Sequence, residues 1–500
     1  MTGPVVTVDV VVVGMGPGGE AVAGELAAAG LSVVGVESRL VGGECPYFGC
    51  IPSKMMIRAA NALAEARRVS GLAGHSSVEP DFSVVARRIR DEATDNWDDA
   101  VAAKRFTDKG GQLVRGTGRL SGPRQVTVAM NDGGEATFSG RVAVVLNPGT
   151  NPAVPPVPGL AGTPLWTNRE ALRAEEAPAS LMVLGGGPIG VELAQAFARF
   201  GTHVTVVARG PRLVPREEPE ASELLADVFR GEGIDVLLHT DTTAVSHSPG
   251  GFTVELSTGG PDDAGPSVSQ LTVEKLLVAT GRTSTLGALS LDAAGIAWDG
   301  KNAPGVDGHL QMADGLYLMG DAAGAGAFTH LSMYHANIVA GHILGREEAG
   351  RQDVGREGAG RQGAARQVAG RQAAGRDRGT TESHAVPRVT FTDPEIGAVG
   401  LTERQAREAG LDVRTGFTDL ADSTRGWIHQ ARGFIKLVAD ADKGTLVGAA
   451  AVGPSGGEVL SMLALAVHAR VPVATLKTMI YAYPTFHRAV ESALADLQTR

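Results

Sequence analysis

Two cysteines are the residues of this chain best suited to redox chemistry. Cys45 and Cys50 are the only cysteines among 500 residues, and they lie close together in the segment 42–54, which reads GGECPYFGCIPSK. A close pair in a chain long enough to build its own core is more often catalytic or metal-binding than structural. The segment contains no further cysteine or histidine, so it predicts no metal site. The pattern favours a redox-active pair; the alternative is two buried thiols without a function.

The elements that must hold this pair begin at the start of the chain. An apolar strand at 8–13 is followed by a glycine turn and an alanine-rich helix. In that turn Gly14 permits a tight bend, Gly16 lets the backbone approach a pyrophosphate, and Gly19 lets the helix pack against the strand. A second strand ends in Glu37, 23 residues after Gly14, near the spacing at which an acid binds an adenosine ribose. The unit predicts a dinucleotide site; the alternative is a glycine-rich turn followed by a solvent-facing glutamate.

A second unit of this kind follows in mid-chain. Gly185, Gly187 and Gly190 lie between an apolar strand and a helix, so the chain predicts two bound nucleotides. The next strand ends near Arg209, where a site for NAD usually has a carboxylate. Arginine pairs with a 2′-phosphate through charge-assisted hydrogen bonds, and two more arginines follow within seven residues. We therefore expect NADPH rather than NADH, the alternative being that these arginines form ordinary solvated surface.

Composition and charge narrow the class of function. The length predicts about three domains, and 43% hydrophobic residues, 20% charged residues and 68 glycines are typical of a globular α/β protein. A net charge of −10 gives no basic footprint for nucleic acid or an anionic membrane, which favours small-molecule chemistry. The first residues have no basic region before an apolar stretch, and no apolar run approaches about 18 residues. We expect a cytoplasmic protein without a membrane span.

The positions of the cysteines suggest which cofactor they meet. They follow Glu37 by eight and thirteen residues, so they belong to the first nucleotide unit and should reach the reactive ring of its cofactor. A flavin fits that position, because FAD can couple hydride transfer from a nicotinamide to the two-electron reduction of a disulfide.

The segment 42–54 resembles the redox helix of the pyridine nucleotide-disulfide oxidoreductases, the family of dihydrolipoamide dehydrogenase, glutathione reductase and mercuric reductase. Gly281 and Arg282 lie in a stretch similar to the family's crossover back to the FAD domain. Gly320 and Asp321 lie in a stretch similar to its second FAD motif. The resemblance implies that Asp321 binds the ribityl chain of the flavin; the alternative is a helix N-cap, a common use of aspartate.

The resemblance also implies an α/β fold with two Rossmann-like dinucleotide-binding domains, for FAD and NAD(P), plus a C-terminal α+β dimerisation domain that forms a homodimer. The expected order is an FAD-binding domain, an inserted NAD(P)-binding domain, a returning FAD segment, a low-complexity insertion and the dimerisation domain. The expected bounds are 1–155, 156–283, 284–345, 346–383 and 384–500.

The insertion at 346–383 departs from the family pattern. Arginine recurs there every five residues from Arg346 to Arg376, within glycine, alanine and glutamine. Five-residue steps advance about 140° around a helix, so no apolar face results. We expect a flexible, solvated linker, the alternative being a partner-binding arm.

The resemblance assigns roles around the cysteines. Cys50 corresponds to the flavin-side thiol and Cys45 to the interchange thiol that attacks the substrate. Lys54 lies one helical turn after Cys50, where its charge would stabilise a thiolate or the reduced flavin. Glu192 resembles the carboxylate partner of that lysine, the alternative being an acid favoured by the helix dipole. Gly43, Gly149 and Lys54 join the expected cofactor-binding residues.

The C-terminal segment departs from the disulfide reductases. Tyr483 occupies the position of their acid-base histidine and Arg488 that of the glutamate that follows it. An unperturbed tyrosine has a pKa of about 10 against about 6.5 for histidine, so it is a poor proton shuttle at neutral pH. This substitution argues against turnover of lipoamide or glutathione. A displaced dyad of His487 and Glu491 is one alternative, although a one-turn shift moves the imidazole about 5 to 6 Å. The other alternative is an acceptor that needs no dyad.

One smaller departure lies beside the interchange thiol. Glu44 replaces a usual threonine, and its charge would raise the pKa of the Cys45 thiol. The sequence thus predicts an FAD-dependent oxidoreductase that passes a hydride from NADPH through FAD to the cysteine pair and on to a disulfide or related acceptor. The alternatives are a quinone or metal-ion reductase of the mercuric type, and a flavin-binding redox sensor without steady turnover.

Overall fold

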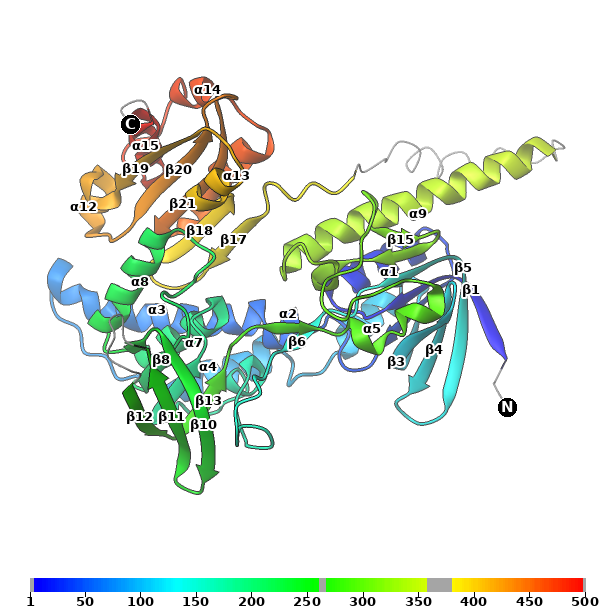
Figure 1. Ribbon diagram of the computed structural model, residues 1–500, viewed down its shortest axis with the longest axis horizontal. Helices are drawn as coiled ribbons and strands as arrows, with labels where there is room; N and C mark the ends of the chain where they lie inside the picture. Colours follow the sequence, from blue (N-terminus) through cyan, green and yellow to red (C-terminus); the bar gives the residue numbers. More distant parts are fainter. Residues whose placement is uncertain (1–3, 260–266, 358–379, 498–500) are drawn as a thin grey trace. The chain divides into compact units, whose positions relative to one another are not determined.

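The computed structural model describes residues 4–259, 267–357 and 380–497 (Figure 1). The chain forms two compact units, each assembled from three separate stretches of sequence. The first unit comprises Met1–Gly49, Thr94–Asn151 and Arg282–Glu382, and the second comprises Cys50–Ala93, Pro152–Gly281 and Ser383–Arg500.

Among the described residues of the first unit, seven strands form one sheet. Their order is β1 (Val5–Val13), β2 (Val33–Glu37), β3 (Gln112–Gly122), β4 (Gln125–Met130), β5 (Glu135–Leu146), β16 (Leu316–Leu318) and β15 (Gln311–Ala313). β1 also pairs with β5, and both β2 and β5 run parallel to it.

Strand β1 is buried on both faces. Val10 and Val12 pack in one cluster with residues of the helices α1 (Pro17–Ala28) and α9 (Thr329–Glu357). Val11 and Val13 pack in a second cluster with residues of β3 and β4. Because side chains alternate along a strand, a continuous valine run is what a parallel strand covered on both faces requires. The sheet therefore fixes the turn after β1, which begins at Gly14.

Shorter elements of the first unit lie around this sheet. They are α2 (Glu44–Phe48), α5 (Ala100–Thr107), β14 (Arg282–Ser284) and the 3-10 helices η2 (Leu286–Ala288), η3 (Leu291–Ala294) and η4 (Gly320–Ala323). Helix α9 continues to Glu357, inside the stretch expected to be a linker. Residues 358–379 lie outside the described residues, so the flexible linker and the predicted domain bounds stay predictions.

The second unit contains a parallel sheet built around the second glycine turn. In its described part the order is β13 (Lys275–Val278), β7 (Ser180–Leu184), β8 (His203–Val207) and β9 (Asp235–Leu237), with all pairs parallel. An antiparallel sheet of β10 (Thr240–Ser248), β11 (Gly251–Thr258) and β12 (Ser267–Val273) follows. The helices of this part are α3 (Cys50–Leu72), α4 (Phe82–Arg88), the π-helix η1 (Ile89–Ala93), α6 (Asn168–Ala171), α7 (Pro188–Arg199) and α8 (Pro219–Gly231).

The C-terminal part of the second unit is an antiparallel sheet with helices packed on it. The strand order is β17 (Pro387–Thr390), β18 (Glu395–Gly400), β21 (Thr445–Gly453), β20 (Phe434–Asp440) and β19 (Val413–Asp419). Its core includes Leu437 and Leu463. The helices are α11 (Glu403–Glu408), η5 (Leu420–Asp422), α12 (Thr424–His429), α13 (Gly456–His468), α14 (Val473–Lys477), η6 (Phe486–Arg488) and α15 (Ala489–Asp496).

The predicted fold class is confirmed. Each glycine turn follows a buried parallel strand and opens a helix, and an α+β part follows them near the C-terminus. Within the described ranges, every helix is too short or too polar to traverse a lipid bilayer.

Candidate functional site

The first glycine turn has the close approaches that its sequence predicts. Gly14 has φ +91°, and a Cβ atom there would lie 2.2 Å from the carbonyl oxygen of Asn147. A Cβ atom on Gly19 would lie 2.0 Å from the carbonyl oxygen of Gly14, so helix α1 packs directly on the turn. Gly16, the N-cap of α1, has no side chain of its own to cover the first amides of the helix. The turn therefore presents backbone N–H groups to an anion.

Glu37 closes this turn from the end of β2. Its carboxylate accepts hydrogen bonds from the backbone N–H groups of Met15 and Arg39, both at 2.8 Å. Burial raises the pKa of Glu37, and these two hydrogen bonds oppose the increase. The acid thus fixes the backbone of the turn, at the position where a ribose hydroxyl is expected.

A polar network joins the crossover residue Arg282 to Asp321. The Arg282 guanidinium donates to the hydroxyl of Thr150 at 2.6 Å and to its carbonyl oxygen at 2.7 Å. The Thr150 hydroxyl in turn donates to Asp321 at 3.1 Å. Burial raises the pKa of Asp321, whereas Thr150 and the charge of Arg282 lower it. Arg282 also lies 3.9 Å from the carboxylate of Glu44, the residue before Cys45.

Three more glycines of the first unit adopt left-handed backbone. Gly43, Gly149 and Gly320 have φ of +67°, +68° and +68°. A Cβ atom on Gly43 would lie 2.8 Å from the Cα atom of Gly16, so the segment before Cys45 passes directly over the glycine turn. The N–H group of Gly320 donates to Nδ1 of His335 at 3.2 Å. Burial lowers the pKa of His335 to about 4, which keeps this ring neutral and able to accept.

The two cysteines lie in the first turns of neighbouring helices. Cys45 is half-buried in α2, and Cys50 is exposed as the first residue of α3. The boundary between the two compact units falls between Gly49 and Cys50.

Lys54 and Glu192 form the ion pair that the resemblance implies. The ammonium of Lys54 lies 2.8 Å from Oε2 of Glu192, a residue that is 6% exposed. The other oxygen of Glu192 accepts the backbone N–H group of Phe391 at 2.8 Å. The Lys54 ammonium also lies 4.5 Å from the centre of the Phe391 ring. The ammonium group of Lys54 is thus held in one position, four residues after Cys50 on the same helix.

The second glycine turn repeats the geometry of the first. Gly185 has φ +115°, and a Cβ atom there would lie 2.3 Å from the carbonyl oxygen of Ala279. A Cβ atom on Gly190 would lie 2.2 Å from the carbonyl oxygen of Gly185. A Cβ atom on Gly187, the N-cap of α7, would meet no atom within 4 Å, which leaves room for a pyrophosphate. Gly281, with φ +135°, lies beyond the end of β13 in the same unit.

Arg209 follows β8 and points into solvent. Its side chain is 86% exposed, and its Nε atom lies 3.9 Å from Asp241. A pair at that distance and exposure contributes little stability, so Arg209 can reorient towards an anionic ligand.

The C-terminal candidates are not arranged as a displaced dyad. Glu491 pairs with Arg488 at 2.9 Å, because the two residues lie three positions apart on adjoining helical turns. The ring of His487 instead lies near Tyr481, at 6.1 Å between ring centres. The hydroxyl of Tyr483 donates to Thr424 at 3.2 Å, and Arg488 lies 5.5 Å from the Tyr483 ring.

Family models match most of the chain. Residues 8–339 match the pyridine nucleotide-disulphide oxidoreductase family, and residues 386–494 match the dimerisation domain of the same family. The chain belongs to this family. It is therefore an FAD-dependent oxidoreductase that uses a pyridine nucleotide, and its dimerisation domain supports a homodimer.

Relatives of two named kinds align along nearly the whole chain. A mercuric reductase of Acidithiobacillus ferrooxidans is 33% identical over 96% of this chain and 81% of its own length. A dihydrolipoyl dehydrogenase of Thermus scotoductus is 30% identical over 98% and 97%. Among solved structures, the Cu(II) complex of the HOCl-induced flavoprotein disulfide reductase RclA from Escherichia coli has a TM-score of 0.78. It is 26% identical and covers 98% of this chain and 99% of that chain.

The first unit fits FAD by its own geometry. A Cβ atom on Gly149 would meet no atom within 4 Å, so a ligand has room against the backbone there, and Asp321 is a half-buried carboxylate of the kind that accepts ligand hydroxyl groups. Three residues that hold this arrangement were not among the predicted site residues. Asn147 donates to the carbonyl oxygen of Gly14, Thr150 joins Arg282 to Asp321, and His335 fixes Gly320.

Proposed function

We propose that this enzyme passes electrons from NADPH to the Cys45 and Cys50 pair and from there to a disulfide or a related thiol-reactive acceptor. The observation that carries the proposal is the Lys54 and Glu192 ion pair, one helical turn after Cys50. A cation held one helical turn from Cys50 favours the thiolate, which is the reactive form of cysteine.

The coenzyme preference rests on Arg209. Its exposed guanidinium follows β8, at the end of the second glycine unit, where it can pair with a 2′-phosphate. No carboxylate occupies that sequence position, so a 2′-phosphate meets no repulsion from it.

The chain's own residues have the following roles in the proposal. The Gly14 and Gly185 turns bind the pyrophosphates of FAD and NADPH, with Glu37 and Asp321 as acceptors for hydroxyl groups of FAD. When bound, FAD would accept a hydride and deliver electrons to sulfur. Cys50 is the thiol nearer the flavin and Cys45 the one that attacks the acceptor. Lys54 holds positive charge one helical turn after Cys50, and Glu192 keeps Lys54 in place.

A mercuric ion is a second candidate acceptor. Reduction of a disulfide, NADPH + H⁺ + RSSR → NADP⁺ + 2 RSH, needs a proton for a leaving thiolate. Reduction of a mercuric ion, NADPH + Hg²⁺ → NADP⁺ + Hg⁰ + H⁺, needs no proton at the acceptor. Tyr483 stands in place of a histidine acid-base group, and Arg488 holds Glu491, which favours an acceptor of the second kind. Mercuric reductases are also among the relatives.

An anaerobic acceptor screen tests the proposal. Lipoamide, glutathione disulfide, mycothiol disulfide, mercuric ion and menadione would each be added to the enzyme with NADPH, in weak buffer with a pH indicator. A disulfide acceptor consumes one proton per NADPH and mercuric ion releases one. Cys45→Ser should abolish both reactions. Menadione reduction that Cys45→Ser leaves intact, with no other turnover, would make the enzyme a quinone reductase, and no turnover with any acceptor would leave a redox sensor.

We also propose that the enzyme works in the cytoplasm. Its two cysteines are assigned to catalysis, and reducing compartments are where such pairs are used without structural disulfides. Measuring NADPH oxidation in the cytosolic fraction of cells with and without the chain would test this location.

A further inference from the structure

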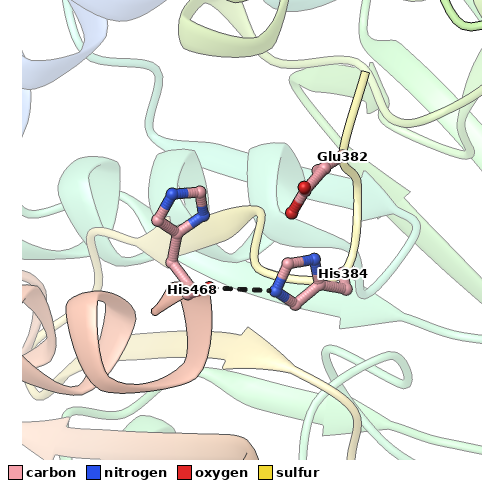
Figure 2. A group of neighbouring side chains, drawn as sticks. All are labelled: Glu382, His384 and His468. Atoms are coloured by element: carbon pink, nitrogen blue, oxygen red, sulfur yellow. Dashed lines mark hydrogen bonds between the residues drawn. The ribbon is translucent and has the colours of Figure 1, made fainter. Parts of the chain in front are cut away.

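Two histidines of the second unit face one another outside the redox site. His384 lies in the stretch before β17, and His468 is the last residue of α13. Their rings are nearly parallel, with an interplanar angle of 8° and centres 5.9 Å apart. A nitrogen atom of each ring lies within 4.8 Å of the other (Figure 2). His384 is half-buried and His468 is exposed, so an ion can enter from solvent.

A hydrogen bond determines which nitrogen of His384 can bind a metal ion. Its Nε2 atom lies 3.3 Å from the backbone carbonyl oxygen of His468. A carbonyl oxygen can only accept, so Nε2 carries the proton and Nδ1 carries the lone pair in the neutral ring. Histidines that ligate metals commonly donate their other N–H group to a backbone carbonyl in this way, which fixes the tautomer and the ring. The hydrogen bond therefore gives His384 the tautomer and the fixed ring orientation expected of a metal ligand.

The sequence supplies a third donor beside this pair. Glu382 precedes His384 by two residues, and Figure 2 draws its carboxylate beside the two imidazole rings. Two imidazoles and a carboxylate are borderline donors, which suit Zn²⁺ better than Mg²⁺ or Ca²⁺. Ligand atoms about 2.1 Å from a tetrahedral zinc ion lie about 3.4 Å apart, so a spacing within 4.8 Å closes by small side-chain rotations.

We propose that His384 and His468, with Glu382, bind one divalent transition-metal ion of the Zn²⁺ class. With three protein ligands a fourth position remains for water. The ion would tie the stretch that enters the C-terminal sheet to the end of α13. This site is independent of the acceptor at Cys45 and Cys50, and it needs no bound cofactor.

Isothermal titration with Zn²⁺ tests the proposal on untagged, full-length, FAD-loaded protein. Both cysteines would be replaced by serine, because thiolates bind zinc themselves. We expect one Zn²⁺ per chain, and we expect His384→Asn and His468→Asn each to weaken binding at least tenfold. Glu382→Gln should weaken it as well. The matched control is His309→Asn, since His309 stacks on His342 in the first unit with ring centres 4.1 Å apart.

Thermal melting separates metal binding from a merely structural role. Zn²⁺ should raise the melting temperature of the parent and of His309→Asn, but not that of His384→Asn or His468→Asn. If the two variants melt lower without metal and still bind Zn²⁺ like the parent, His384 only caps the helix and the proposal is wrong. The absence of Zn²⁺ binding to the cysteine-free parent, or an equal loss in His309→Asn, would also overturn it.

Discussion

The ammonium of Lys54 and the buried carboxylate of Glu192 lie 2.8 Å apart, although 138 positions separate them in the sequence. Glu192 receives one further hydrogen bond, from the N–H group of Phe391. The pair thus connects helix α3, which begins at Cys50, with helix α7, which follows the second glycine turn.

Replacing Lys54 by methionine should destabilise the protein. The substitution keeps the aliphatic stem but leaves the carboxylate of Glu192, a residue that is 6% exposed, with the N–H group of Phe391 as its hydrogen-bond donor among the described residues. We expect the free energy of unfolding to fall by about 1–3 kcal/mol, measured by urea denaturation. In the double variant Lys54→Met with Glu192→Gln no buried charge is left, so most of the loss should be recovered. Equal and additive losses in the two single variants would show that the pair is not coupled.

Alanine substitutions at two glycines of the second turn should affect different properties, stability at Gly190 and NADPH binding at Gly187. A Cβ atom on Gly190 would lie 2.2 Å from the carbonyl oxygen of Gly185, whereas one on Gly187 would meet no atom within 4 Å. We expect Gly190→Ala to lower the free energy of unfolding by about 1–3 kcal/mol. Gly187→Ala should fold normally but weaken NADPH binding at least tenfold, because its methyl group occupies space near the pyrophosphate. Urea denaturation and fluorescence titration with NADPH measure the two effects.

The stability of the first unit should fall between pH 6.5 and 4 because of His335. Burial lowers its folded pKa to about 4, against 6.5 for an ordinary histidine. The stabilising neutral form is fully present above pH 6.5 and is lost as the pH falls towards 4, with a cost of about 3 kcal/mol. His335→Gln does not titrate and can still accept the Gly320 N–H group, so its unfolding free energy should vary less with pH. His75→Gln, at an exposed position, is the control, and an unchanged slope in His335→Gln would contradict the assignment.

The sequence was sufficient to predict the nucleotide units because their determinants are local. A valine strand, a glycine that needs positive φ and a glycine that admits a helix all lie within six positions of the turn. Gly19 and Gly190 make the same contact with Gly14 and Gly185, as their spacing predicts.

Contacts between distant segments could not be predicted in the same way. The hydrogen bond from Gly320 to His335 and the bridge from Arg282 through Thr150 to Asp321 depend on how strands are ordered in the sheet. The pairing of Glu491 was also missed. His487 and Arg488 precede Glu491 by four and three positions, so the sequence alone does not decide between them. In the structure the carboxylate of Glu491 pairs with Arg488, the last residue of η6.

Coenzyme choice should depend on the charge at Arg209. Glutamate there would restore the carboxylate usual in NAD sites and repel a 2′-phosphate, so Arg209→Glu should shift the ratio of kcat/KM values at least tenfold towards NADH. The side chain is 86% exposed, so the substitution should leave the melting temperature unchanged. Arg230→Ala, which removes an exposed arginine of α8 paired with Asp227, is the matched control for surface charge. Equal rates with NADPH and NADH in the parent, or the same ratio in Arg209→Glu, would mean that other residues select the coenzyme.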